Sequence, residues 1–235
     1  MSRVSRSFRI VGWILRILLS LAIGAVIGLL CWRLFVSTSV PANVKTIDAN
    51  EKLCRAYREA GGDLYMFSQN QTSITRGEKN AGYFSTEDTR IIPDANQIQI
   101  LFRYNNSTIR HLARDYQLDR VPDKGEELFE VTLLRTTDLT PEDKSDNGDP
   151  ATLAEERFYP TSAVRAETSL YTYYRFVFDG VTVEGDTDGV FADIYYRGDI
   201  DYKKTPYGAL CLCADGDAWL PYSLSSGDRK ALGKK

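Results

Sequence analysis

The chain has 235 residues, which leaves room for one membrane segment and one domain of ordinary size. It carries 29 basic and 32 acidic residues, for a net charge of −3. Residues 1–36 hold five of the basic residues and no acid, so the remainder has 24 basic and 32 acidic residues and a net charge of −8. The overall charge of such a remainder does not attract nucleic acid or anionic lipid, and the sequence has no basic stripe that nucleic-acid binding would need.

An apolar stretch near the N-terminus predicts a single transmembrane helix over residues 17–36. It reads ILLSLAIGAVIGLLCWRLFV and contains one charged residue, Arg33. Twenty residues of α-helix are roughly 30 Å long, the thickness of the hydrocarbon core of a bilayer. Residues 17–36 are therefore expected to contact the lipid bilayer.

Charge on either side of this stretch predicts its orientation. The basic residues that precede the apolar core are Arg3, Arg6, Arg9 and Arg16. Basic residues next to a membrane helix stay on the cytoplasmic side. We therefore expect residues 1–16 to form a cytoplasmic basic segment of a single-pass plasma-membrane protein, with the C-terminal domain extracellular.

Three alternatives to a retained membrane anchor are open. A cleaved signal peptide would fit the small residues around Val40, Pro41 and Ala42, but the apolar run exceeds the roughly 7–15 residues of a signal core. Lipid attachment at Cys31 is disfavoured because Leu30 stands where a small residue is needed. A buried helix of a soluble protein is disfavoured because no partner helices follow it.

Small residues recur every four positions in the predicted membrane helix, at Ser20, Gly24 and Gly28. Such a stripe allows two helices to approach closely, which makes a homodimer through the membrane helix a candidate. Glycine is also common in membrane helices for other reasons, so the stripe has a second interpretation.

The rest of the chain is divided into three parts by its composition. Residues 37–46 are polar and predict a short spacer. Residues 47–224 predict an extracytoplasmic domain that begins with a helix over residues 47–60, capped by Asp48 with Glu51 three positions later and ended by Gly61 and Gly62. Residues 225–235 predict a polar tail with at most one frayed helical turn.

Alternation of apolar and polar residues predicts that the domain is mainly β. The expected strands are residues 64–67, 97–104, 128–135, 170–178, 190–197, 208–214 and 218–222, and residues 73–76 are a candidate for one more. Residues 77–96 and 105–126 are expected to be loops, and 149–156 a short helix. Asp179 with Gly180 is a dipeptide typical of a hairpin turn. Seven or eight short strands without regular β–α alternation predict an antiparallel β-sandwich ectodomain.

Three cysteines outside the membrane segment, Cys54, Cys211 and Cys213, are candidates for one disulfide. Cys211 and Cys213 are two apart in a predicted strand and point the same way, so either would have to pair with Cys54. The alternative is that all three are small core residues. This spacing lacks the four ligands of a structural zinc site, and no metal or other cofactor is predicted. An acidic loop that begins at Asp143 resembles the start of a calcium loop, but Ala154 stands where a glutamate is required.

The sequence gives little support for catalysis. His111 is the one histidine, and no nucleophile motif lies near it. We therefore expect a non-enzymatic protein. A surface hydrolase that uses two carboxylates is an alternative, because acidic residues are plentiful.

Aromatic and charged residues on the expected strand 170–178 predict a binding surface. Tyr171, Tyr173 and Arg175 share one face of that strand, and Trp219 and Tyr222 are candidates to extend it. Exposed aromatics beside arginine suit contacts with a protein or a glycan of the cell envelope. The alternative is that this face is covered and the residues pack. The sequence therefore favours an envelope-anchored binding or scaffold module, with an accessory subunit that acts through its membrane helix as the alternative.

Overall fold

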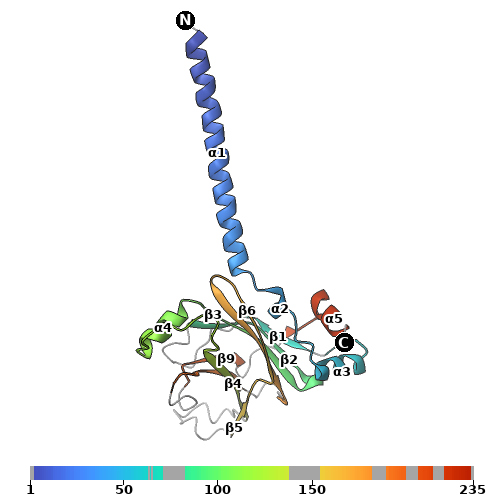
Figure 1. Ribbon diagram of the computed structural model, residues 1–235. Helices are drawn as coiled ribbons and strands as arrows, with labels where there is room; N and C mark the ends of the chain where they lie inside the picture. The colour runs from blue at the N-terminus through green and yellow to red at the C-terminus, as the bar shows by residue number, and fades with distance from the viewer. Residues whose placement is uncertain are drawn as a thin grey trace, which may run out of the picture. The chain divides into compact units, whose positions relative to one another are not determined.

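The computed structural model describes residues 3–62, 64, 66–70, 83–137, 154–181, 189–199, 206–213 and 220–233 (Figure 1). The chain divides into two compact units, Met1–Ser39 and Val40–Lys235.

The first unit is a single helix, α1 (Arg3–Thr38), which contains the predicted segment 17–36. Among the described residues it is the one helix long and apolar enough to cross a membrane. Its described side chains from Gly12 to Val36 are exposed. A helix that is apolar all round requires an apolar environment.

The second unit is mainly β and contains two antiparallel sheets. The six-stranded sheet consists, in spatial order, of β10 (Leu220–Pro221), β1 (Phe67–Asn70), β2 (Phe84–Ile92), β3 (Gln97–Asn105), β7 (Tyr171–Asp179) and β6 (Ser162–Glu167). The four-stranded sheet consists of β5 (Ala154–Phe158), β4 (Phe129–Thr137), β8 (Gly189–Tyr196) and β9 (Gly208–Cys213). The strands predicted at 97–104, 128–135, 170–178, 190–197 and 208–214 are therefore confirmed.

The main hydrophobic core takes side chains from both sheets. The six-stranded sheet contributes alternate residues of β3 and β7, including Phe102 and Phe176, and the four-stranded sheet contributes Val131, Ile194 and Leu210. Rings pack closely here: the centroids of Phe102 and Phe176 are 6.0 Å apart. The apolar residues that alternate along each of these strands are thus the ones whose side chains point into this core.

The turn at Asp179 and Gly180 does not form the hairpin that its sequence predicts. β7 and β8 belong to different sheets, so the chain crosses from one sheet to the other after this turn. Gly180 has a φ of +80° and donates its backbone N–H to the carbonyl of Asn96 at 2.8 Å. Glycine is needed there for its positive φ rather than for a two-residue hairpin.

Three predicted loop or helix regions have a different structure. β2 lies inside the region 77–96 that was expected to be a loop. Residues 105–126 contain α4 (Thr108–Asp115), which buries Ile109 and Leu112 one turn apart. The end of the helix expected at 149–156 is strand β5, which pairs with β4.

Short helices lie at both ends of β3 (Figure 1). α3 (Glu51–Glu59) and the 3-10 helix η2 (Pro93–Ala95) lie near its start, and α4 follows its end. The N-cap of α3 is Asn50, which accepts from the N–H of Leu53, and not the predicted Asp48. Asp48 is instead bonded to β3, as described below.

The predicted spacer and the predicted polar tail both contain helices. Residues 37–46 include α2 (Ala42–Lys45), with Val44 buried. Residues 225–235 include α5 (Ser226–Leu232), which has a capping box formed by Ser225 and Asp228. Asp228 and Leu232 are buried, so this segment packs on the domain and is not a free tail.

Candidate functional site

The outer face of the six-stranded sheet is the face turned away from the main core. On β3 it carries Gln99 and Leu101, and on β7 it carries Tyr171, Tyr173 and Arg175. Tyr173 and Arg175 are 0% exposed, and Tyr171 is half-buried. The prediction that these three residues form an exposed binding surface is therefore wrong for Tyr173 and Arg175, because another part of the chain covers them.

A β-bulge in β2 brings further charged residues to this face. The register of β2 against β3 shifts between Thr86 and Asp88. A bulge adds one unpaired residue and re-aims the side chains that follow it. Asp88 then lies opposite Leu101, which lies opposite Arg175 on β7. An acid and a base therefore share one row of the sheet, and Arg90 follows two residues after Asp88.

Four charged side chains on this face form what we call the ionic cluster: Asp88, Arg90, Arg175 and Asp228. The Nε of Arg90 lies 2.6 Å from Oδ2 of Asp88, and its Nη1 lies 3.0 Å from Oδ1 of Asp228. The Nη2 of Arg175 lies 3.3 Å from the same oxygen of Asp88. Buried charges are tolerated only when they are paired, and two acids with two bases balance the charge of this cluster.

The ionic cluster binds the backbone of the segment that enters the domain, residues 40–48, which we call the entry segment. Arg175 donates from Nε to the carbonyl of Val44 at 3.0 Å and from Nη2 to the carbonyl of Lys45 at 3.1 Å. The N–H of Ile47 donates to Oδ1 of Asp228 at 2.8 Å. These bonds satisfy buried backbone groups that no sheet partner satisfies.

Gln99 and Ser162 hold the end of the entry segment. The side-chain amide of Gln99 accepts from the N–H of Asp48 at 2.8 Å and donates to the carbonyl of Asp48 at 2.9 Å. Ser162 donates its hydroxyl to the carboxylate of Asp48 at 2.7 Å. Val44 is fully buried in a small cluster with Leu101 and Tyr173. The entry segment is thus built into the domain and is not a loose spacer.

Helix α5 contributes the acid at the centre of this arrangement. Ser225 donates to Oδ2 of Asp228 from its hydroxyl at 2.6 Å and from its backbone N–H at 3.1 Å. The hydroxyl of Tyr222 donates to the same oxygen at 3.0 Å. The guanidinium of Arg90 lies over the ring of Tyr222, 4.6 Å from its centroid. Tyr222, a predicted binding residue, is therefore a half-buried part of the interior.

The environment of the ionic cluster shifts its pKa values. Burial by itself raises the pKa of Asp228, but hydrogen bonds from Ser225 and Ile47 and the charge of Arg90 outweigh burial and lower the pKa to about 2. Burial lowers the pKa of Arg175 to about 10, and the neighbouring charge of Arg90 acts in the same direction. Both arginines and Asp228 are therefore charged at neutral pH.

Asp228 is expected to make the domain sensitive to acid between about pH 4 and pH 2. Its folded-state pKa of about 2 lies below the ordinary value of 3.8. The ionised carboxylate of Asp228 therefore stabilises the folded domain by about 2 kcal/mol above pH 4. This stabilisation is lost as the pH falls through the folded-state pKa. Thermal unfolding of the wild type and of Asp228→Asn from pH 5 to pH 2 would measure it. Equal slopes for the two proteins would contradict this assignment, and Asp119→Asn, at an exposed position, serves as the control.

None of the other predicted site residues that the structure describes belongs to the ionic cluster. Ser20, Gly24 and Gly28 lie on α1, where a Cβ added to either glycine would meet no atom within 4 Å. Trp219 lies outside the described residues, as does the acidic loop that begins at Asp143.

Cys54 and His111 both have structural surroundings. Cys54 is a free, buried cysteine in the second core cluster, and its thiol donates to the carbonyl of Ala49 at 3.6 Å. Cys211 and Cys213 lie on β9, and their side chains are outside the described part of the structure. In this structure Cys54 therefore forms no disulfide.

The ring of His111 stacks on Tyr83 with centroids 4.7 Å apart. Within the described residues no group of three or more His, Cys, Asp or Glu could hold a metal ion.

A surface pocket of about 520 Å³ lies at the end of β3 and the beginning of α4. We call it the Asn106 pocket, and the lining residues used below are Asn106, Arg110, Val121, Asp123, Lys124 and Leu170. Asn106 fixes its wall: the side-chain amide donates to the carbonyls of Thr168 and Ser169 at 3.1 and 3.2 Å, and the amide oxygen accepts from Thr172 at 2.7 Å. The pocket is therefore preformed by the turn between β6 and β7.

Comparisons of this chain with protein families, with curated proteins and with solved structures found no match.

The sequence prediction missed Asp88, Arg90 and Asp228. For Asp228 a pattern was available, because Ser225 and Asp228 have the three-residue spacing of a capping box. For Asp88 and Arg90 the bulge removes the alternation that would have marked β2 as a strand.

Proposed function

We propose that this protein is a single-pass plasma-membrane protein whose N-terminus is cytoplasmic and whose extracytoplasmic domain is a non-enzymatic binding or scaffold module of the cell envelope. The proposal takes α1 as the membrane anchor and the two sheets as a β-sandwich. A core shared by both sheets supports the sandwich. The length and apolar composition of α1 support the anchor.

The entry segment carries the proposal. α1 ends at Thr38, and by Val44 the chain is bound to buried side chains of the domain. A domain that had to search a large volume would have a long polar linker. Here five or so residues separate the helix end from the first buried bond, which suits a module held at a fixed distance from the bilayer.

The surroundings of Asp88, Asp228 and His111 support a non-enzymatic role. A general acid or base must be within reach of a substrate. Asp88 and Asp228 are instead bound to the arginines of the ionic cluster, and Asp228 is fully buried. The ring of His111 is stacked on Tyr83 rather than placed beside a nucleophile. A carboxylate-dependent hydrolase is thus the weaker candidate.

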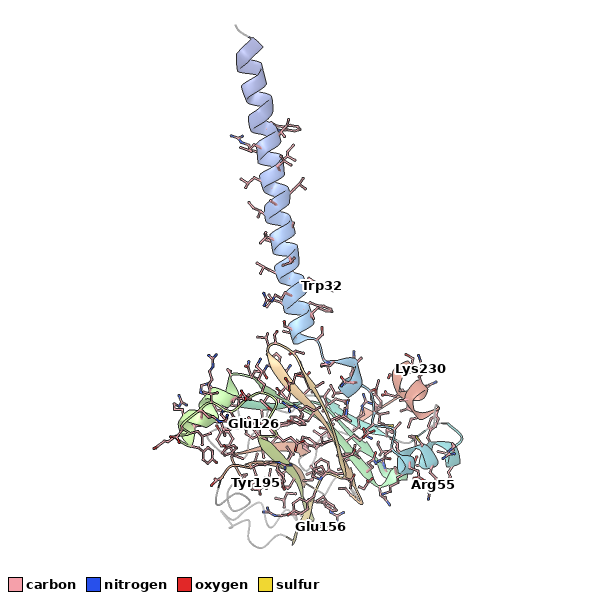
Figure 2. All side chains as sticks on the ribbon, in the orientation of Figure 1. Trp32, Arg55, Glu126, Glu156, Tyr195 and Lys230 are labelled. Atoms are coloured by element: carbon pink, nitrogen blue, oxygen red, sulfur yellow. The ribbon has the colours of Figure 1, made fainter. Side chains whose placement is uncertain are left out.

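Lysine labelling offers a direct test of the orientation. The first lysine of the chain is Lys45, so every lysine follows α1. An amine reagent that cannot cross membranes should modify exposed Lys230 (Figure 2) in intact cells or spheroplasts. Labelling that appears only after the membrane is opened would mean that the orientation is the reverse of the one proposed.

The intact mass of the protein from membranes tests retention of the anchor, because a chain that begins at Asn43 would mean a cleaved signal peptide.

Capture of partners separates the domain from the membrane helix. Residues 17–36 are replaced by an unrelated apolar helix, and the protein is cross-linked in its own membrane. If the domain binds the partner, the same cross-linked protein or glycan is recovered from both forms. If the partner is no longer recovered once the native helix has been replaced, the result would favour an accessory subunit that pairs through Ser20, Gly24 and Gly28.

A further inference from the structure

The Asn106 pocket lies at the end of the six-stranded sheet where the chain enters the domain. Val40, the first residue of the domain, packs against the cluster that contains Tyr173, together with Tyr171. Tyr171 is paired with Asn105, the last residue of β3 and part of the pocket lining. Ser169 and Leu170, in the turn just before Tyr171, also line the pocket. The pocket and Val40 therefore share one end of the sheet.

Exposed apolar side chains are concentrated at the rim of this pocket. Outside α1, the exposed large hydrophobic residues of the described chain are Val121, Tyr159 and Leu170, at 53%, 52% and 37% exposure. Two of these three, Val121 and Leu170, line the Asn106 pocket. Leaving apolar side chains in water is unfavourable, so an apolar partner that covers both side chains would gain from their burial.

Two positively charged side chains, Arg110 and Lys124, also line this pocket. Within the described structure the side chains of Arg110 and Lys124 make no hydrogen bond or ion pair, and both residues are exposed. Asp123 is the one acid of the lining. The pocket therefore has a local excess of positive charge in a domain whose sequence is acidic overall. An exposed arginine and lysine suit a phosphate oxygen.

Both walls of the pocket are fixed before any ligand binds. Asn106 accounts for one wall, as described above. On the other, Arg165 of β6 donates from Nη1 to the carbonyl of Gly125 at 2.7 Å and from Nη2 to the carbonyl of Lys124. Preorganised walls reduce the entropy lost on binding.

We propose that the Asn106 pocket docks on the outer surface of the bilayer that holds α1, with Arg110 and Lys124 at the phosphate of an anionic phospholipid and Val121 and Leu170 in contact with the interfacial acyl chains. This inference rests on the proposed membrane anchoring. The net acidic charge of the domain does not draw it to lipid from solution, but the anchor keeps the pocket close to the bilayer, where local charge and apolar contact suffice.

Photo-cross-linking of the full chain in lipid nanodiscs tests the docking. A benzophenone amino acid replaces Val121, Leu170 or Tyr159 in discs of phosphatidylcholine with phosphatidylglycerol. Tyr159 is the matched control, because it is equally exposed but precedes β6, whereas Leu170 follows β6 at the other end. Figure 2 shows Glu156, close to Tyr159 in sequence, well separated from Glu126, which is close to Lys124. Lipid adducts are expected at 121 and 170, at least ten-fold above those at 159.

The charge of the pocket is tested by the double variant with Arg110→Gln and Lys124→Gln. Each cation near an anionic surface is worth about five-fold in affinity, so the enrichment of phosphatidylglycerol over phosphatidylcholine among the adducts should fall to near one. Both residues are exposed, and neither side chain is bonded to any residue that the structure describes, so the fold should not change. Equal lipid adducts at 121, 170 and 159, or unchanged lipid enrichment in the double variant, would overturn the docking. A protein that does not remain in the discs at all would instead overturn the anchoring.

Discussion

The Asp228→Ala variant is expected to lower the free energy of unfolding of the domain by about 3–5 kcal/mol, because removing one partner leaves the other charges of a buried cluster uncompensated. The carboxylate of Asp228 is fully buried and accepts from Ile47, Tyr222 and Ser225 while it pairs with Arg90. For a domain of this size the melting temperature should fall by about 10 °C. Thermal unfolding followed by circular dichroism would measure the change.

Two further variants make this expectation specific. Asp119→Ala removes an exposed acid and should change the free energy of unfolding by no more than about 0.5 kcal/mol. Asp228→Asn keeps an acceptor for Ser225 but loses the charge that faces Arg90, and should lie between the wild type and the alanine variant. If Asp228→Ala matched Asp119→Ala, α5 would be the dispensable tail that the sequence predicts.

The strands of this domain could be predicted where one face alone is buried in the main core. On β3 and β7 the residues that reach the core are alternate, and a period of two marks them clearly. The same alternation suggested that Tyr173 and Arg175 face water. The cover on that face comes from Val44, which is 131 residues from Arg175 in the sequence. A pattern within a strand contains no information about a cover supplied from so far away.

β2 was missed for a local reason. The bulge between Thr86 and Asp88 places consecutive polar residues in a strand whose two faces are both partly covered. A polar stretch without alternation is read as a loop. Asp88 and Arg90, the two members of the ionic cluster in β2, are thus among the polar residues that remove the alternation of this strand.

α5 was missed because it is short and polar. Seven residues give too little helical periodicity to distinguish a packed helix from a frayed turn. Its stability comes from its cap and from contacts of Asp228 with residues far away in the sequence, such as Ile47 and Arg90. The candidate site could therefore not be predicted as a unit, because its members come together only through the tertiary fold.

The Arg175→Met variant is expected to release the entry segment and to lower the free energy of unfolding by about 3 kcal/mol. Methionine fills much of the same volume, but the carbonyl of Val44 loses its buried donor, and the carbonyl of Lys45 keeps only the longer bond from Nη2 of Arg90 at 3.5 Å. Leaving buried acceptors unsatisfied costs about 1–3 kcal/mol each, part of which local rearrangement recovers. Amide hydrogen exchange should therefore become faster at Ile47 and Asp48, where the backbone N–H groups are bonded to side chains of the domain.

Arg103→Met provides the matched control for this variant. Arg103 lies on the same face of the adjacent strand β3, pairs with Glu87 at 2.7 Å and stacks over Tyr171, but makes no hydrogen bond to the entry segment among the described residues. The Arg103→Met variant should leave amide hydrogen exchange at Ile47 and Asp48 unchanged. Equal exchange in the two variants would mean that Arg175 does not hold the entry segment. Faster exchange in Arg175→Met alone would mean that one buried arginine holds the entry segment on the outer face of the six-stranded sheet.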